Sequence, residues 1–168
     1  MNRYTVAVLV RNQFGVLNRV TSMFRRRQFN ISALTVSETE TSELSRITVV
    51  FSGDAIEKQQ LINQLYKLPD VCSIKEFNDD NSISCELLLI KMLNDPDSRG
   101  DIQSAADAFG AITVDYSKDT IILQLTDSSR KIDDFINLMR DYTILEICRT
   151  GSVSLEKGST TIRQTINL

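Results

Sequence analysis

The fold of this chain is indicated most clearly by residues 10–20, which read VRNQFGVLNRV. A strand-like apolar run ends at Val10, a short polar loop follows, and an amphipathic helical pattern begins at Gly15. A helix that starts directly after a strand points free backbone N–H groups and the positive end of its dipole at whatever lies in front of it. That arrangement suits a small carboxylate. The stretch therefore favours an amino-acid-binding loop over a catalytic one.

Two residues of this loop are suited to ligand contact. The side chain of Asn12 is able either to cap the following helix or to donate to a ligand, and Gly15 lets the backbone approach closely. From the local pattern alone, a helix cap and a tight turn explain the two residues better than a binding site does. A second asparagine, Asn30, stands at the entry to the next predicted strand.

The hydrophobic pattern of residues 4–77 predicts the element order βαββαβ. Apolar and β-branched runs predict strands at 4–10, 31–36, 45–51 and 71–77, and helical spacing predicts one helix after residue 15 and another from Asp54. The first strand is apolar almost throughout, as expected of a strand buried on both faces.

The same order recurs in the second half. Strands are predicted at 83–93, 112–116, 121–126 and 144–149, and helices at 101–109 and from Ser128 or Ser129 to 139. The polar stretch 78–82 marks the boundary. We predict an α+β chain of two tandem ferredoxin-like βαββαβ sandwiches, at residues 1–78 and 83–168, with a loose end from residue 158 onward.

The amino-acid composition argues against two classes of function. The 168 residues include no histidine, so neither a Ser-His-Asp nor a Cys-His catalytic arrangement is available, and catalysis is disfavoured. The net charge of −3 argues against wholesale binding of nucleic acid.

The spacing of the cysteines and the length of the apolar runs indicate the cellular compartment. Cys72, Cys85 and Cys148 are odd in number, far apart and without C-x-x-C spacing, which predicts buried free thiols and no zinc site. No apolar run approaches the roughly 20 residues of a membrane-spanning helix, and the first residues lack a signal-peptide pattern. We therefore expect a cytoplasmic protein with no membrane contact.

Several segments carry a resemblance to a known family. They are RNQFGVL at 11–17, FNISALTV at 29–36, LIK at 89–91, KIDDF at 131–135 and ILEICRTG at 144–151. Together they resemble the small, regulatory subunits of acetolactate synthase (acetohydroxyacid synthase), whose N-terminal half is an ACT domain. The resemblance implies an effector-binding site formed by one loop and by a segment of the partner ACT domain: Asn12, Gln13, Phe14, Gly15, Val16 and Leu17 from the loop, Asn30 and Ile31 from the partner.

The resemblance also implies a function. Such a subunit has no catalytic residue, metal site or cofactor of its own. It forms a homodimer through its ACT domains, activates a large catalytic subunit that uses thiamine diphosphate, magnesium and FAD, and confers feedback inhibition by a branched-chain amino acid, usually valine. The pathway would be the biosynthesis of valine, leucine and isoleucine.

Other interpretations stay open from the residues alone. An RNA-recognition module has the same element order but needs exposed aromatics on central strands, where this sequence offers only Phe51 and, in the second half, Tyr116. A free-standing enzyme would depend on carboxylates such as Glu86 or Glu146, which no neighbouring base accompanies in the sequence.

Two further motifs each have two interpretations. The run at 25–27, three arginines, is either a solvated helix end favoured by the dipole or a contact for the large subunit. The run Arg149-Thr150-Gly151 is either a simple strand end and turn or part of the activating surface.

Overall fold

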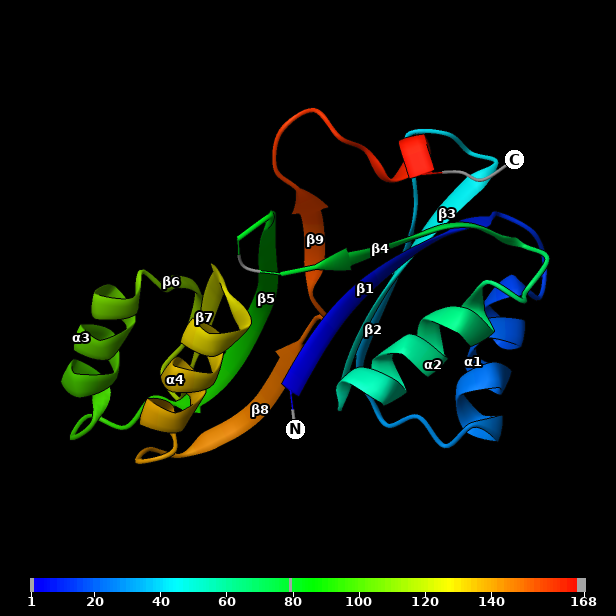
Figure 1. Ribbon diagram of the computed structural model, residues 1–168. Helices are drawn as coiled ribbons and strands as arrows, with labels where there is room; N and C mark the ends of the chain where they lie inside the picture. Colours follow the sequence, from blue (N-terminus) through cyan, green and yellow to red (C-terminus); the bar gives the residue numbers. More distant parts are fainter. Residues whose placement is uncertain (1, 79, 166–168) are drawn as a thin grey trace. The chain divides into compact units, whose positions relative to one another are not determined.

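The computed structural model describes residues 2–78 and 80–165, which form two compact units. Unit 1 comprises residues 1–83 and 151–168, and unit 2 comprises residues 84–150. In each unit, two helices lie on one face of an antiparallel sheet (Figure 1). The predicted α+β class with two ferredoxin-like βαββαβ patterns is confirmed.

Unit 1 follows the predicted order. Its sheet has the strand order β2-β3-β1-β4, with every neighbouring pair antiparallel. The elements are β1 (Asn2–Arg11), α1 (Val16–Arg26), β2 (Ile31–Glu38), β3 (Leu44–Gly53), α2 (Ala55–Leu65) and β4 (Val71–Phe77). The helix α2 begins with a capping box, in which Asp54 accepts from the N–H of Glu57 and the Glu57 side chain accepts from the N–H of Asp54.

The central strand β1 is buried on both faces, as its sequence predicted. Val6, Val8 and Val10 belong to the core cluster beneath α1 and α2. Ala7 and Leu9 alternate with them on the opposite face and are equally inaccessible to solvent. Something other than the two helices must therefore cover that second face.

Unit 2 repeats the pattern with a sheet in the order β6-β7-β5-β8. Its elements are β5 (Ser82–Leu93), α3 (Arg99–Phe109), β6 (Ile112–Tyr116), β7 (Thr120–Asp127), α4 (Ser129–Met139) and β8 (Ile144–Arg149). The predicted stop of α3 at Gly110 is present, because this glycine has a left-handed backbone (φ 75°). Ser128 caps α4 by accepting from the N–H of Lys131.

The C-terminal segment differs from the prediction. We call residues 151–165 the C-terminal strap; it contains β9 (Val153–Glu156) and the short 3₁₀ helix η1 (Ile162–Thr165), and it groups with unit 1. The local sequence pattern predicts that this segment belongs to the second domain and has a loose end from residue 158 onward. The strap instead lies on the sheet face of unit 1 that α1 and α2 leave uncovered, where apolar residues such as Leu9 favour burial.

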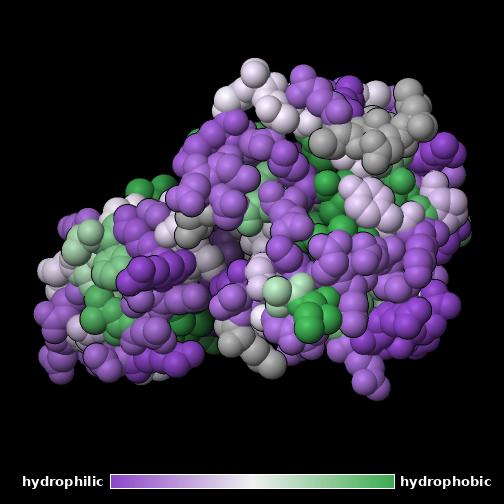
Figure 2. Space-filling model, in the orientation of Figure 1, coloured by the Kyte–Doolittle hydropathy of each residue, from purple (hydrophilic) through white to green (hydrophobic). Residues whose placement is uncertain are grey.

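The outer surface of the helices is polar. In Figure 2, hydrophilic side chains dominate the visible side of α1 and α2, as expected of helices whose apolar residues point toward a sheet. Among the described residues, no helix is long and apolar enough to cross a membrane.

Candidate functional site

The predicted effector loop connects β1 to α1 and is fixed by backbone hydrogen bonds on two sides. The N–H of Arg11 donates to the carbonyl oxygen of Asp70 (2.9 Å), and the N–H of Asn12 donates to that of Glu43 (2.7 Å). Gly15 has a φ of 82°, a left-handed conformation that residues with a Cβ rarely adopt. The turn that starts the helix therefore favours glycine at this position.

The N-terminus of α1 is left open by this turn. No side chain of the described residues caps it, and its first turn, which starts at Val16, has no acidic residue. The helices α2 and α4 have side-chain caps at Asp54 and Ser128; α3 lacks such a cap but has Asp101 in its first turn. Free N–H groups at a helix start bind carboxylates well, so the start of α1 can receive one.

Asn12 does not cap α1, although its position allowed that prediction. Its side-chain amide nitrogen Nδ2 donates to the carbonyl oxygen of Ser42 (2.8 Å) and to Oε1 of Glu38 (3.1 Å). Asn12 thus fastens the loop to the turn between β2 and β3. Sequence reasoning had no signal for this, since the partners lie 26 and 30 residues away.

Apolar side chains surround the open helix start. Phe14 is fully exposed and Leu17 is 42% exposed, whereas Val16 is buried in the core of unit 1. Gln13 lies in the same turn and accepts from the N–H of Val16 through its carbonyl oxygen (3.3 Å). Exposed apolar residues beside free N–H groups suit an amino acid with an apolar side chain.

A basic side chain also lies beside the loop. A Cβ added to Gly15 would lie 3.9 Å from Nη1 of Arg19. The Nε atom of the same guanidinium lies 2.7 Å from Oδ2 of Asp70, a buried aspartate in the turn before β4. This ion pair fixes the first turn of α1 against that turn and adds positive charge near the helix start.

Asn30 and Ile31 lie far from this loop within one chain. Ile31 pairs with Phe51, which pairs with Tyr4 near the start of β1, whereas the loop follows Arg11 at the end of β1. Seven residues of strand separate Tyr4 from Arg11, which corresponds to about 23 Å. The structure therefore brings the predicted loop residues together and keeps the two predicted partner-chain residues apart from them.

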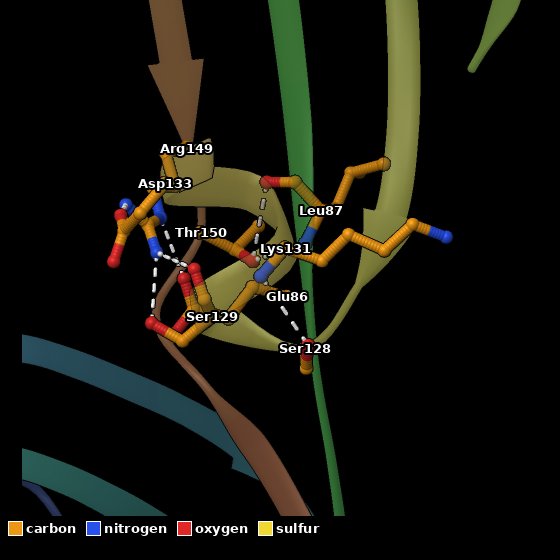
Figure 3. Close-up of polar contacts among 8 residues, drawn as sticks. All are labelled: Glu86, Leu87, Ser128, Ser129, Lys131, Asp133, Arg149 and Thr150. Carbon is orange, nitrogen blue, oxygen red and sulfur yellow. Dashed lines mark hydrogen bonds and ion pairs between the residues drawn. The ribbon is translucent and has the colours of Figure 1, made fainter. Parts of the chain in front are cut away.

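Unit 2 contains a polar cluster that connects β5, β8 and α4 (Figure 3). Nε of Arg149 lies 2.6 Å from Oε2 of Glu86, and its Nη1 lies 2.6 Å from Oδ1 of Asp133. Its Nη2 also donates to Oγ of Ser129 (2.9 Å). The side chain of Glu86 is 1% exposed, so this buried carboxylate depends on Arg149 for its charge partner.

The residues of this cluster keep the Arg149 guanidinium protonated. Burial by itself lowers the pKa of Arg149, but its hydrogen bonds to Asp133 and Glu86 and their negative charges outweigh burial and hold the pKa above its ordinary value. The guanidinium stays protonated and holds the end of β8 against β5 and the first turn of α4.

The competing interpretations lose support from the geometry. Phe51 is packed in the core of unit 1, so it offers no stacking surface to an RNA base. Glu86 is buried in its ion pair, and Glu146 lies at the surface 3.8 Å from Lys91. Within the described residues, no group of histidine, cysteine or acidic side chains is arranged to hold a metal ion.

The cysteine prediction is half right. All three cysteines are free thiols, as the sequence predicted. Cys72 and Cys85 are half-buried, but Cys148 is exposed, contrary to the expectation of buried thiols. The reason is its place on β8: it pairs with Leu89 on the sheet face opposite α3 and α4.

Two family profiles match this chain. The profile described as AHAS small subunit-like ACT domain matches residues 6–73, and the profile described as small subunit of acetolactate synthase matches residues 85–158. A protein of Archaeoglobus fulgidus named "Probable acetolactate synthase small subunit" is 43% identical over 157 residues, covering 94% of this chain and 98% of its own length. The acetolactate synthase small subunit of Bacillus subtilis is 39% identical over 155 residues, which cover 92% of this chain and 90% of its own length.

A solved structure agrees with these sequence matches. The crystal structure of the acetolactate synthase small subunit from Thermotoga maritima superposes with a TM-score of 0.86 at 33% identity, covering 95% of this chain and all of that one. The resemblance inferred from the sequence is thereby confirmed, and the chain belongs to the acetolactate synthase small-subunit family.

Proposed function

We propose that this chain is the regulatory subunit of an acetolactate synthase and acts in the biosynthesis of branched-chain amino acids. In this proposal it binds the large catalytic subunit in the cytoplasm, raises its turnover and confers feedback inhibition by valine. The observation that carries the regulatory part is the open start of α1 after Gly15, in a region that matches an ACT-domain profile. Free N–H groups there provide a site for the carboxylate of an amino acid.

The surroundings of this helix start fit the rest of the ligand. Leu17 is partly exposed beside it and offers an apolar wall to a branched side chain. An ammonium group needs oxygen acceptors, and the amide oxygen of Asn30 is one that a partner chain would supply. The effector-binding set is therefore Asn12, Gln13, Phe14, Gly15, Val16 and Leu17 from one chain with Asn30 and Ile31 from its partner.

A homodimer is required by this proposal. Because Ile31 and the loop lie at opposite ends of β1, one chain cannot bring them to a single ligand. Two ACT domains related by a two-fold axis would place the loop of each chain beside Asn30 of the other. Such a dimer has two equivalent effector sites.

The chemistry of acetolactate formation is assigned to the large subunit. This chain contains no histidine, and its buried carboxylate Glu86 is occupied by Arg149. We propose that thiamine diphosphate, magnesium and FAD are bound by the large subunit alone. The purified chain should then form no acetolactate from pyruvate.

Binding measurements on the purified chain test the regulatory site. Titration calorimetry with valine, leucine and isoleucine should give saturable binding of at least one of them, and glycine, which lacks the apolar side chain, should bind much more weakly. Size-exclusion chromatography with the cognate large subunit should give a complex. Absence of binding by all three amino acids would overturn the effector site, and absence of a complex would overturn the subunit assignment.

A further inference from the structure

The C-terminal strap crosses the face of the unit 1 sheet that the helices leave open. Gly151 lies so close to β2 that an added Cβ would clash with Oγ1 of Thr35. Further along, Nη2 of Arg46 donates to the carbonyl oxygen of Ser154 (2.5 Å), and Nζ of Lys75 pairs with Oε1 of Glu156 (2.8 Å). The strap thus contacts β2, β3 and β4 in turn.

The end of the strap reaches the turn between β2 and β3. Nη2 of Arg163, in η1, lies 3.0 Å from Oε1 of Glu40 and also donates to the hydroxyl oxygen of Thr41. Figure 1 shows η1 beside this turn. The turn is itself ordered by Thr39, whose hydroxyl oxygen accepts from the N–H of Thr41 (3.1 Å).

The same turn holds the effector loop. Asn12 donates its backbone N–H to the carbonyl oxygen of Glu43 and its side-chain amide to that of Ser42. Arg163 and Asn12 therefore contact, between them, four consecutive residues of this turn, 40–43. A displacement of this turn would move the partners on which the shape of the loop depends.

The middle of the strap is not densely packed. A cavity of about 380 Å³ lies between it and the sheet, with apolar walls from Leu9, Phe77, Leu155 and Ile162. Packing density is therefore low where the chain leaves β9. Beyond this cavity, the contacts of Arg163 join the strap to the turn.

We infer that the C-terminal strap tunes effector binding, with Arg163 as a positioning residue that orders the turn 39–43 and, through it, the loop at Asn12. This inference rests on the proposed effector site but concerns a different part of the chain. The segment responsible continues directly from Thr150 at the end of β8, so the residues after the second domain contribute to the site in the first.

The expected effect is modest. The side chain of Arg163 is 37% exposed and that of Glu40 is 73% exposed, so solvent screens their attraction. Loss of the pair should weaken effector binding about threefold to fivefold. The difference should shrink at high salt, because screening weakens exposed ion pairs.

Arg163→Gln and Arg163→Lys in the full-length chain test this inference, with Arg26→Gln as the matched control. Arg26 is an exposed arginine in the last turn of α1, so its substitution removes the same charge from the same unit. Titration with valine should show weaker binding by Arg163→Gln, affinity nearer the parent's for Arg163→Lys, and unchanged affinity for Arg26→Gln. Parent affinity in Arg163→Gln would overturn the inference.

Hydrogen exchange of the ligand-free protein gives a second readout that does not depend on the proposed effector. The backbone amide of Asn12 should exchange faster in Arg163→Gln than in the parent and in Arg26→Gln. Unchanged exchange at Asn12 would refute the positioning role, even if no amino acid binds the parent. Faster exchange at Asn12 in Arg163→Gln, together with no binding of any amino acid by the parent, would support the positioning role of Arg163 and overturn the proposed effector site.

Discussion

Asn12 and Ser42 are joined by a hydrogen bond of 2.8 Å from the side-chain amide nitrogen of the first to the backbone carbonyl oxygen of the second. The bond links the loop before α1 to the turn after β2, so the geometry at the helix start depends on a segment 30 residues away. The proposed site is consequently a property of the folded unit 1 rather than of its loop sequence alone.

Gly15→Asp should weaken effector binding strongly without unfolding the protein. The left-handed φ of residue 15 costs a non-glycine residue about 1 kcal/mol, and aspartate tolerates it better than most. The new carboxylate would lie near Arg19 and compete for the N–H groups of α1. Titration with valine should show affinity reduced about a hundredfold, equal to about 2.8 kcal/mol.

Gly100→Asp is the matched control for this change. Gly100 lies at the start of α3 in unit 2, where an added Cβ meets nothing within 4 Å and the φ is not left-handed. It places the same charge at another helix start, so its valine affinity should equal that of the parent. Equal weakening in both variants would mean that the effect is general electrostatics rather than loss of a site.

Asn30→Ala should weaken effector binding from the other chain of the dimer, and mixing variants tests that arrangement. A dimer of one Gly15→Asp chain and one Asn30→Ala chain would have one doubly altered site and one site with both native residues. Co-refolded mixtures should therefore bind valine at parent affinity with about one quarter of the parent stoichiometry, assuming random pairing in which half of the dimers are mixed. If the mixture binds valine no better than each variant alone, the result would argue against a site shared between chains.

The sequence predicted nearly all of this fold because its signals are local. Helical spacing, strand-like runs and turn residues such as Gly110 each depend on a few neighbouring positions, and the structure confirms them. The open start of α1 was predicted for the same reason, since the helical pattern at Gly15 begins after a strand and a short loop. Asn12 was also singled out, but its contacts with Glu38 and Ser42 were not predictable, because they join residues brought together by strand pairing.

The C-terminal strap was missed for a physical reason. Most of its residues are polar and its few apolar residues follow no extended helical or strand period, so the local pattern indicates a loose end. Its order comes from long-range contacts with residues such as Arg46 and Lys75. One signal was available: Ala7 and Leu9 are apolar on the sheet face that two helices cannot reach, which required a cover from elsewhere.

Arg149→Met should destabilise unit 2, since it removes the guanidinium that pairs with the buried carboxylate of Glu86. Breaking a buried pair in this way costs about 3 kcal/mol. Adding Glu86→Gln to the same chain should recover much of the loss, because the remaining buried group is then neutral. Urea denaturation followed by far-UV circular dichroism measures both effects; equal stability of Arg149→Met and the parent would contradict the structural role.

Asp127→Asn should lower stability at neutral pH and lose this effect in acid. Hydrogen bonds from the Lys131 ammonium and the N–H of Ser128 lower the pKa of Asp127 below its ordinary 3.8. A carboxyl group whose pKa is lower in the folded than in the unfolded state stabilises the fold at pH values above the unfolded-state pKa. This contribution disappears as the pH falls through the folded-state pKa. Because both side chains are partly exposed, the difference should be under about 1 kcal/mol at pH 7. Denaturation curves at about pH 7 and pH 3 should show it only at the higher pH.

The most direct test of the regulatory assignment is the rate of acetolactate formation from pyruvate by the cognate large subunit, measured while this chain and then valine are titrated in. Saturating amounts of the chain should raise the rate, valine should then lower it toward the basal value, and the chain alone should have no activity. A rate that stays unchanged at saturating chain, or activity from the chain without any large subunit, would contradict the account.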